Sequence, residues 1–358
     1  MNWKKGYNIF FIVYSPTMNE AEFQRLKKVL SEPKKIAIVT HRNPDGDAYG
    51  SSLGLYWFLI KNGHQVTVVS PNDCPEFLKW LPGEDQIEIF EGNQETGKEI
   101  LNEAELVFTL DFNAFHRLGE TMGPFMEEIQ PIYIKIDHHQ QPDDYAEFSF
   151  VNSSMSSTSE MVYQFIDRLG MKESVDQDIA SCLYAGILTD TGSFRFPATT
   201  SATHRVVAHL LEKGANNAEI YNKIHDVNTY NRMQLLGRAL DNMVVLDRFH
   251  TAYITLSQSE LNRYKFQRGD TEGFVNYGLS IKNVMFAAIF IEDKKQKIIK
   301  ISFRSVGEFS VNEFARNHFN GGGHVNAAGG RSDLSLNETV KKFVNLLPSL
   351  TNELTLSS

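Results

Sequence analysis

Histidine and aspartate residues gather at three places in the sequence, and each group follows or ends a short apolar run. The groups are His41-Arg-Asn-Pro-Asp45-Gly-Asp47, Asp111 and Asp137-His138-His139. Carboxylate and imidazole ligands without cysteine favour Mn²⁺ and, less selectively, Mg²⁺, Fe²⁺, Co²⁺ or Zn²⁺. Such a ligand set can hold cations that activate water and clamp a phosphoryl oxygen.

The apolar runs beside these groups are predicted to be strands of one sheet. They are Ile36–Thr40, Glu105–Asp111 and Ile132–Asp137, and Gln65–Ser70 is a further strand. Continuous apolar runs are typical of strands covered on both faces, as in the parallel sheet of a doubly wound α/β fold. The carboxyl ends of such strands face one crevice, where these folds bind ligands. We therefore expect the three groups to converge.

Converging carboxylates and imidazoles need countercharge, because like charges at short range repel strongly. Divalent cations supply it. A carboxylate that bridges two ions ~3.5–4 Å apart would give a two-metal arrangement. The segment Ser157-Thr-Ser-Glu160 has the spacing of a capping box, and we interpret it as a helix start and nothing more.

The length of 358 residues predicts two domains, at roughly 150 residues each. The sequence becomes β-rich after about Asn242, which indicates a smaller mixed α+β domain. We predict a metal-binding domain over 18–227, a helical connector over 228–241 and a second domain over 242–350. Residues 1–17 are interpreted as a disordered extension or a start assigned too early.

The formal charge of −9 argues against binding long nucleic acid, but a short anionic substrate held by a few groups or by cations is compatible with it. Cys74 and Cys182 form no paired-thiol motif, which fits a reducing cytosol and predicts a cytoplasmic protein. No apolar run approaches the ~20 residues that a membrane helix needs, so no membrane association is expected.

Together the motifs resemble those of the DHH phosphoesterase family. The segment His41–Ser51 is similar to the first motif, Asp111 lies in the second, and Asp137-His-His139 is the triplet that names the family. Asp190, in Gly-Ile-Leu-Thr-Asp, is similar to the fourth motif, and the segment Gly321–Gly329 to the signature of the associated C-terminal domain. The resemblance spans roughly residues 30–345 in the expected order.

The resemblance implies two Mn²⁺ ions, with Mg²⁺ or Co²⁺ as substitutes, and a hydroxide between them that attacks phosphorus. One ion would be held by His41, Asp45 and Asp111. The other would be held by Asp47, Asp111, His138 and Asp190, with Asp111 as the bridge. Taken singly, Asn-Pro-Asp-Gly is turn chemistry and Asp111 could be a helix cap, but the joint pattern favours metal ligands.

Further roles are implied for catalysis and substrate binding. His139 matches the family's phosphate-contacting histidine and Asp137 its partner, so both join Asp111 as catalytic residues. In the second domain, the groups that resemble phosphate-binding ones are Arg304, His324 and the backbone N–H groups of Gly322 and Gly323. Three glycines could also form a simple tight turn.

The compact two-domain organisation resembles family members that hydrolyse short oligoribonucleotides (nanoRNA), 3′-phosphoadenosine 5′-phosphate (pAp) or linear dinucleotides such as pApA. Short RNA or nucleotide phosphates are therefore the expected substrates, no long-DNA binding is expected, and the resemblance is compatible with a homodimer. The alternatives are a RecJ-like single-strand exonuclease and a cyclic-dinucleotide phosphodiesterase. A non-catalytic nucleotide-binding protein is the alternative of another class.

Overall fold

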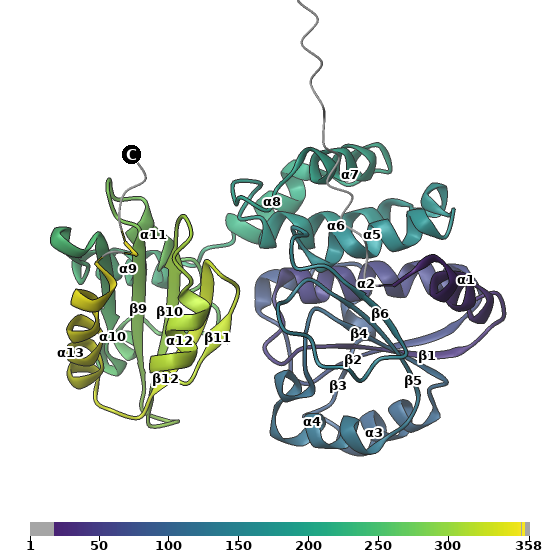
Figure 1. The fold of residues 1–358 in the computed structure, drawn as a ribbon, viewed down its shortest axis with the longest axis horizontal. Coiled ribbons are helices and arrows are strands. Elements are labelled where there is room, and N and C mark those ends of the chain that lie inside the picture. Colours follow the sequence, from purple (N-terminus) through teal and green to yellow (C-terminus); the bar gives the residue numbers. More distant parts are fainter. Residues whose placement is uncertain (1–17, 352, 355–358) are drawn as a thin grey trace, which may run out of the picture. The chain divides into compact units, whose positions relative to one another are not determined.

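The computed structural model describes residues 18–351, 353 and 354, which form two compact units (Figure 1). The first unit ends at Ile224 and the second begins at His225. The extension expected at residues 1–17 lies outside the described residues. None of the helices in the described part of the chain has the length and hydropathy needed to cross a bilayer.

A six-stranded, all-parallel sheet forms the centre of the first unit, with the order β3-β2-β1-β4-β5-β6. Its strands are β1 (Lys35–Thr40), β2 (Gln65–Ser70), β3 (Glu88–Ile89), β4 (Leu106–Leu110), β5 (Ile132–Asp137) and β6 (Phe148–Val151). Alternate residues of β1 belong to two different hydrophobic clusters, so both faces of the sheet are covered. The predicted doubly wound α/β class is confirmed.

Helices cover the two faces of this sheet (Figure 1). One face packs against α2 (Gly46–Lys61) and α5 (Thr158–Arg168), with α6 (Gln177–Asp190) packed on these two helices, and the other face packs against α3 (Gln94–Glu103) and α4 (Gly119–Glu128). The remaining helices of this part of the chain are α1 (Glu20–Val29), α7 (Ser201–Glu212) and α8 (Asn217–His225).

Helices α2 and α6 approach each other at backbone distance because glycines line their contact. A Cβ atom on Gly50 would lie 2.5 Å from the carbonyl oxygen of Cys182 and 2.8 Å from the amide nitrogen of Gly186. Cβ atoms on Gly46 and Gly54, one turn to either side, would also meet α6 side chains at under 3.0 Å. This contact holds the first turn of α2 beside the last turns of α6.

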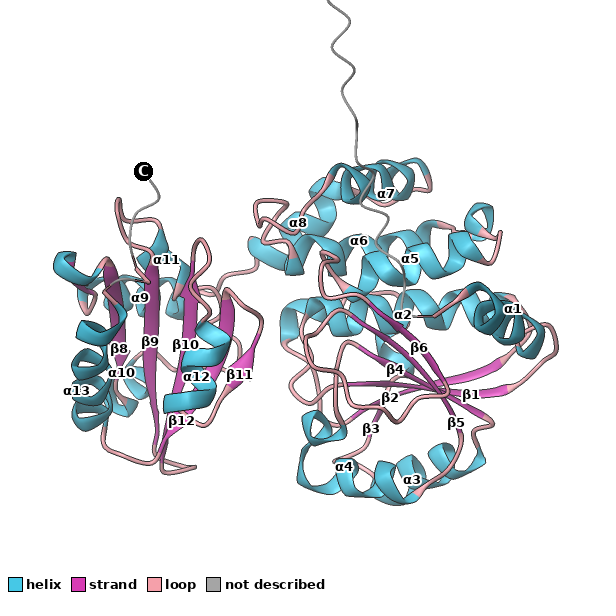
Figure 2. Cartoon of the chain, viewed as in Figure 1, coloured by secondary structure: helices cyan, strands magenta, loops and turns pink. Residues whose placement is uncertain are grey.

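The second unit has a mixed six-stranded sheet with the order β11-β12-β10-β9-β8-β7, in which only β8 and β9 pair in parallel (Figure 2). The strands are β7 (Val244–Leu246), β8 (Thr251–Leu256), β9 (Phe286–Asp293), β10 (Ile298–Ser305), β11 (Gly322–Gly323) and β12 (Ala327–Ser332). Its helices are α9 (Tyr230–Asp241), α10 (Gln258–Arg263), α11 (Asn276–Leu279), α12 (Val311–His318) and α13 (Leu336–Leu346).

Helix α9 covers almost all of the segment 228–241, which we expected to be a connector between domains. Leu235, Leu236 and Ala239 of this helix are buried in one cluster with Ile254 and Leu256 of β8. The helix is amphipathic, and burying its apolar face on the sheet explains why it packs within the second unit.

The glycine contact between α2 and α6 predicts a large effect of one added methyl group. Gly50→Ala should destabilise the first unit by about 1–3 kcal/mol, because backbone atoms of α6 cannot move aside as a side chain would. Urea unfolding followed by tryptophan fluorescence measures this, since Trp57 and Trp80 both lie in the first unit.

Gly237→Ala is the matched control, because Gly237 also lies inside a helix and a Cβ atom there would meet nothing within 4 Å. It should leave the tryptophan transition unchanged. A Gly50→Ala protein that unfolds at the wild-type urea concentration would contradict the tight-contact interpretation.

Candidate metal centre

The three groups of histidine and aspartate lie at the carboxyl ends of neighbouring strands. His41 follows β1, Asp111 follows β4 and Asp137 ends β5. Asp111 has a φ of 65°, in the left-handed region that non-glycine residues seldom adopt, and its N–H donates to the carbonyl oxygen of Ile136 at 3.2 Å. The predicted convergence is therefore present, and Asp111 takes part in three clusters of potential metal ligands.

The first cluster contains His41, Asp45 and Asp111, whose ligand atoms all lie within 4.8 Å of one another. His41 Nε2 is 3.4 Å from Asp111 Oδ2 and 3.9 Å from Asp45 Oδ2. Asp45 is also the N-cap of α2, and its Oδ1 accepts from the N–H groups of Asp47 and Ala48. The turn interpretation of this segment and the ligand interpretation are therefore compatible.

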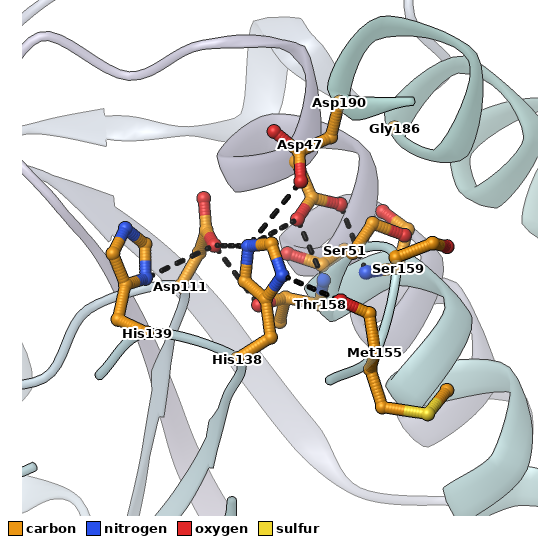
Figure 3. Close-up of polar contacts among 12 residues, drawn as sticks. Asp47, Ser51, Asp111, His138, His139, Met155, Thr158, Ser159, Gly186 and Asp190 are labelled. Carbon is orange, nitrogen blue, oxygen red and sulfur yellow. Dashed lines mark hydrogen bonds and ion pairs between the residues drawn. The ribbon is translucent and has the colours of Figure 1, made fainter. Parts of the chain in front are cut away.

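The second cluster surrounds His138 Nε2 (Figure 3). This nitrogen is 3.3 Å from Asp190 Oδ2, 3.5 Å from Asp111 Oδ1 and 3.8 Å from Asp47 Oδ2. The other ring nitrogen, Nδ1, is 3.2 Å from the carbonyl oxygen of Met155, which can only accept a hydrogen bond. A proton on Nδ1 leaves Nε2 as the nitrogen that can bind a metal among three carboxylates.

The third cluster joins Asp111 to Asp137 and His139. Asp137 Oδ1 accepts from the backbone N–H of His139 at 3.1 Å and lies 2.8 Å from His139 Nδ1. This pair fixes the orientation of the imidazole ring. The other oxygen of Asp137 is buried and, among the described residues, has no hydrogen-bond partner.

The first turn of α5 contacts two of these carboxylates directly, a role that the sequence analysis missed. The N–H groups of Thr158 and Ser159 donate to the two oxygens of Asp47 at 2.6 and 2.8 Å. The Thr158 hydroxyl donates to Asp111 Oδ1 at 2.9 Å (Figure 3). The amino terminus of a helix favours negative charge, so α5 stabilises both buried anions. The interpretation of this segment as a helix start and nothing more was too narrow.

Gly186 of α6 completes the packing around Asp47. A Cβ atom there would lie 1.9 Å from Ser159 Oγ and 2.9 Å from Asp47 Oδ1. Any side chain at this position would displace the first turn of α5 or the carboxylate. Steric crowding therefore explains why the fourth sequence motif has glycine at this position.

Burial and charge shift the pKa values in this centre strongly. Burial alone would lower the pKa of His138, but four neighbouring carboxylates, foremost Asp190, outweigh it and raise this pKa to about 10. Burial raises the pKa of Asp190 to about 7, although the charge of His138 acts to lower it. Burial also raises the pKa of Asp47. These carboxylates require nearby positive charge, which divalent cations would supply, and the buried oxygen and nitrogen donors are consistent with a metal site.

The expected substrate-binding residues of the second unit share one corner of its sheet. Arg304 on β10 pairs with Ala327 on β12, and the carbonyl oxygen of Ala327 accepts from the His324 N–H at 2.7 Å. Gly322 and Gly323 form β11, beside β12. The N–H of Gly323 already donates to the buried Asn312 Oδ1 at 3.1 Å, so the described structure directs this donor at a side chain and not at a ligand.

Comparison with known proteins matches both units to family models. Residues 35–187 match the N-terminal domain of the DHH family, and residues 248–352 match the DHHA1 domain. One relative, named "Probable bifunctional oligoribonuclease and PAP phosphatase NrnA", from Streptococcus mutans, is 33% identical over 87% of this chain and 94% of that protein. The chain therefore belongs to the DHH family of phosphoesterases.

Two further relatives are similar over most of their length. The bifunctional oligoribonuclease and PAP phosphatase NrnA of Thermus thermophilus is 32% identical over 82% of this chain and 83% of that protein. The crystal structure of an exopolyphosphatase-related protein from Bacteroides fragilis has a TM-score of 0.90 and 38% identity, covering 95% of this chain and 99% of that one. Within its family, the chain resembles NrnA.

The hydrogen bond from Thr158 to Asp111 predicts an effect on metal affinity. Thr158→Val removes the hydroxyl but keeps the branched shape and the N–H that binds Asp47. Loss of a partner that orients a metal ligand should weaken Mn²⁺ binding by about tenfold, measured by calorimetry on metal-stripped full-length protein.

Thr251→Val is the matched control. Thr251 is also buried, and its hydroxyl donates to the carbonyl oxygen of Phe249 in the second unit. This variant should bind Mn²⁺ as the wild type does. An unchanged dissociation constant for Thr158→Val would rule out a role of the hydroxyl in orienting Asp111.

Proposed function

We propose that this chain hydrolyses phosphoester bonds in short oligoribonucleotides, in pAp or in linear dinucleotides such as pApA, with two Mn²⁺ ions. The observation that carries the proposal is the position of Asp111. Its two oxygens are directed to different histidines, Oδ2 to His41 and Oδ1 to His138, as a carboxylate between two cations requires. The similarity to proteins named NrnA supports the substrate class.

The proposed metal ligands follow the first two of the three clusters that share Asp111. The first ion would be bound by His41, Asp45 and Asp111. The second would be bound by Asp47, Asp111, His138 and Asp190. When bound, the two cations would activate water and neutralise charge on the phosphoryl oxygens. Helix α5 would hold Asp47 and Asp111 in place throughout the reaction.

His139 and Asp137 are proposed to act together on the substrate. The hydrogen bond between His139 Nδ1 and Asp137 Oδ1, at 2.8 Å, would orient the ring, and an N–H at Nε2 of His139 would donate to a phosphate oxygen. In the same proposal, Arg304 and His324 bind a second phosphate of the substrate, beside the strand formed by Gly322 and Gly323.

A panel of substrates tests this proposal. Purified protein with Mn²⁺ is expected to release product fastest from pAp, pApA and the shortest RNAs. Long single-stranded DNA, cyclic di-AMP, pyrophosphate and short polyphosphate should be poor substrates, and EDTA should abolish turnover. Polyphosphate belongs in the panel because the Bacteroides fragilis relative is described as exopolyphosphatase-related.

Each contrary outcome of the panel identifies another activity. Preference for long DNA would indicate a RecJ-like exonuclease, and preference for cyclic di-AMP a cyclic-dinucleotide phosphodiesterase. A protein that binds nucleotides but hydrolyses none of the substrates, whichever divalent metal is added, would be a non-catalytic binding protein.

The assignment of roles predicts different kinetic effects for the two units. Asp111→Ala removes a ligand from both proposed ions and should lower kcat by more than about 100-fold, beyond the loss typical of outer-shell partners. His324→Ala should mainly raise KM, because its proposed contact is with a part of the substrate that does not react. Steady-state kinetics on pAp and pApA measure both.

Equal and mild losses of kcat in the two variants would overturn the bridging role of Asp111. An unchanged KM for His324→Ala would identify the Gly-Gly-Gly-His segment as a structural turn.

A further inference from the structure

A groove in the first unit lies outside the metal centre. It has a volume of about 630 Å³ and runs between α5, α7 and the residues that follow β6. This volume is within the range of about 300–1,000 Å³ that small-molecule sites occupy. Neither the proposed catalytic residues nor those of the second unit line it.

The charged side chains that line the groove are mostly cationic. Arg168, Lys172 and Arg205 line it, whereas Asp167 is its single carboxylate among the described residues. Arg168 donates to Glu20 at 2.9 Å, but Arg205 and Lys172 are exposed and have no ion-pair partner within 4.0 Å in the described part of the chain. Two unpaired cations in one groove of a chain with a net charge of −9 indicate an anionic ligand.

The uncharged part of the groove suits a planar, partly polar group. Met155 and Val206 provide apolar surface, and the amide side chains of Asn152 and Gln164 provide donors and acceptors. Thioether and aromatic groups attract each other, and amides can read the polar edge of a nucleobase. The groove therefore places cations, which can bind a phosphate, beside a wall that can contact a base. This combination suits a nucleotide better than it suits a simple anion.

The groove is one residue away from the metal centre. Met155, which lines it, accepts the hydrogen bond from His138 Nδ1 through its carbonyl oxygen. Helix α5, which forms one wall, holds Asp47 through its first turn. A ligand in the groove would therefore contact the two elements that position the metal-binding side chains.

We propose that this groove is a second nucleotide-binding site, which takes a nucleoside monophosphate. Arg205 and Lys172 bind the phosphate, and the wall formed by Met155, Asn152 and Gln164 receives the base. The site is separate from the proposed catalytic site and binds its ligand without a metal ion.

The test uses two methionine methyl groups that line the groove. Full-length protein labelled with ¹³C at methionine methyls is stripped of metal with EDTA, which also prevents hydrolysis, and titrated with adenosine 5′-monophosphate. Saturable shifts of the Met155 and Met161 signals, assigned through Met→Leu variants, are expected. Arg205→Glu and Lys172→Glu should each weaken this binding about fivefold or more, because they replace an attractive charge with a repulsive one.

Lys98→Glu is the control for the change in net charge, because Lys98 lies on α3, which packs on the opposite face of the sheet from α5. It should leave the titration unchanged. Shifts that persist unchanged in both groove variants would show that Arg205 and Lys172 do not bind the phosphate and would overturn the proposal. Inorganic phosphate that binds as tightly as adenosine 5′-monophosphate would refute the nucleotide assignment.

These results are independent of the proposed hydrolysis. A protein whose methionine methyl signals do not shift on titration could still hydrolyse its substrates. Conversely, a protein without hydrolytic activity could still bind the nucleotide in the groove. The two proposals therefore fail separately.

Discussion

Repulsion between carboxylates at one water-poor edge of the sheet is the constraint on which the first unit depends. Asp47 and Asp111 are 1% and 2% exposed, and Asp190 approaches the same imidazole nitrogen of His138. Burying an anion is costly unless hydrogen bonds and opposite charges compensate. The amino terminus of α5 provides the hydrogen bonds, and histidines or divalent cations provide the charge. The arrangement is stable only while both are in place.

The close contact of α2 and α6 follows from the same constraint. Asp47 comes from the first turn of α2, and Asp190 is the last residue of α6, yet both must come within 4 Å of His138 Nε2. Ordinary helix pairs have axes 8–10 Å apart, depending on the side chains between them. Glycines at the contact allow the backbones themselves to touch, which brings the two carboxylates to one atom.

The sequence predicted those features that depend on neighbouring residues. The strands before His41 and Asp111, and the one that ends in Asp137, have strong apolar patterns, so the parallel sheet could be inferred and was confirmed. The metal-ligand roles stay predictions, although the structure brings all the proposed ligands of the first unit together. Strand β6 was missed because four residues are too few for a clear pattern.

Contacts between distant segments could not be predicted in this way. Asp47 and Thr158 are 111 residues apart, and the spacing of Ser157 and Glu160 already suggested a local explanation for that helix start. The hydrogen bond from the Gly323 N–H to Asn312 could not be predicted for the same reason. A glycine-rich segment alone does not reveal which of its N–H groups already donate to other residues.

The charges at the proposed metal centre explain why substrate recognition must involve residues elsewhere. Four carboxylates, those of Asp45, Asp47, Asp111 and Asp190, carry a charge of −4, and two divalent cations would add +4, which leaves no net attraction for a phosphate. Coordination can bind the reacting phosphoryl group, but a second phosphate needs cations of its own. Arg304 in the second unit is one such group under the proposed function. A chain with a net charge of −9 would repel the remaining phosphates of a long polyanion, so this charge distribution favours short substrates.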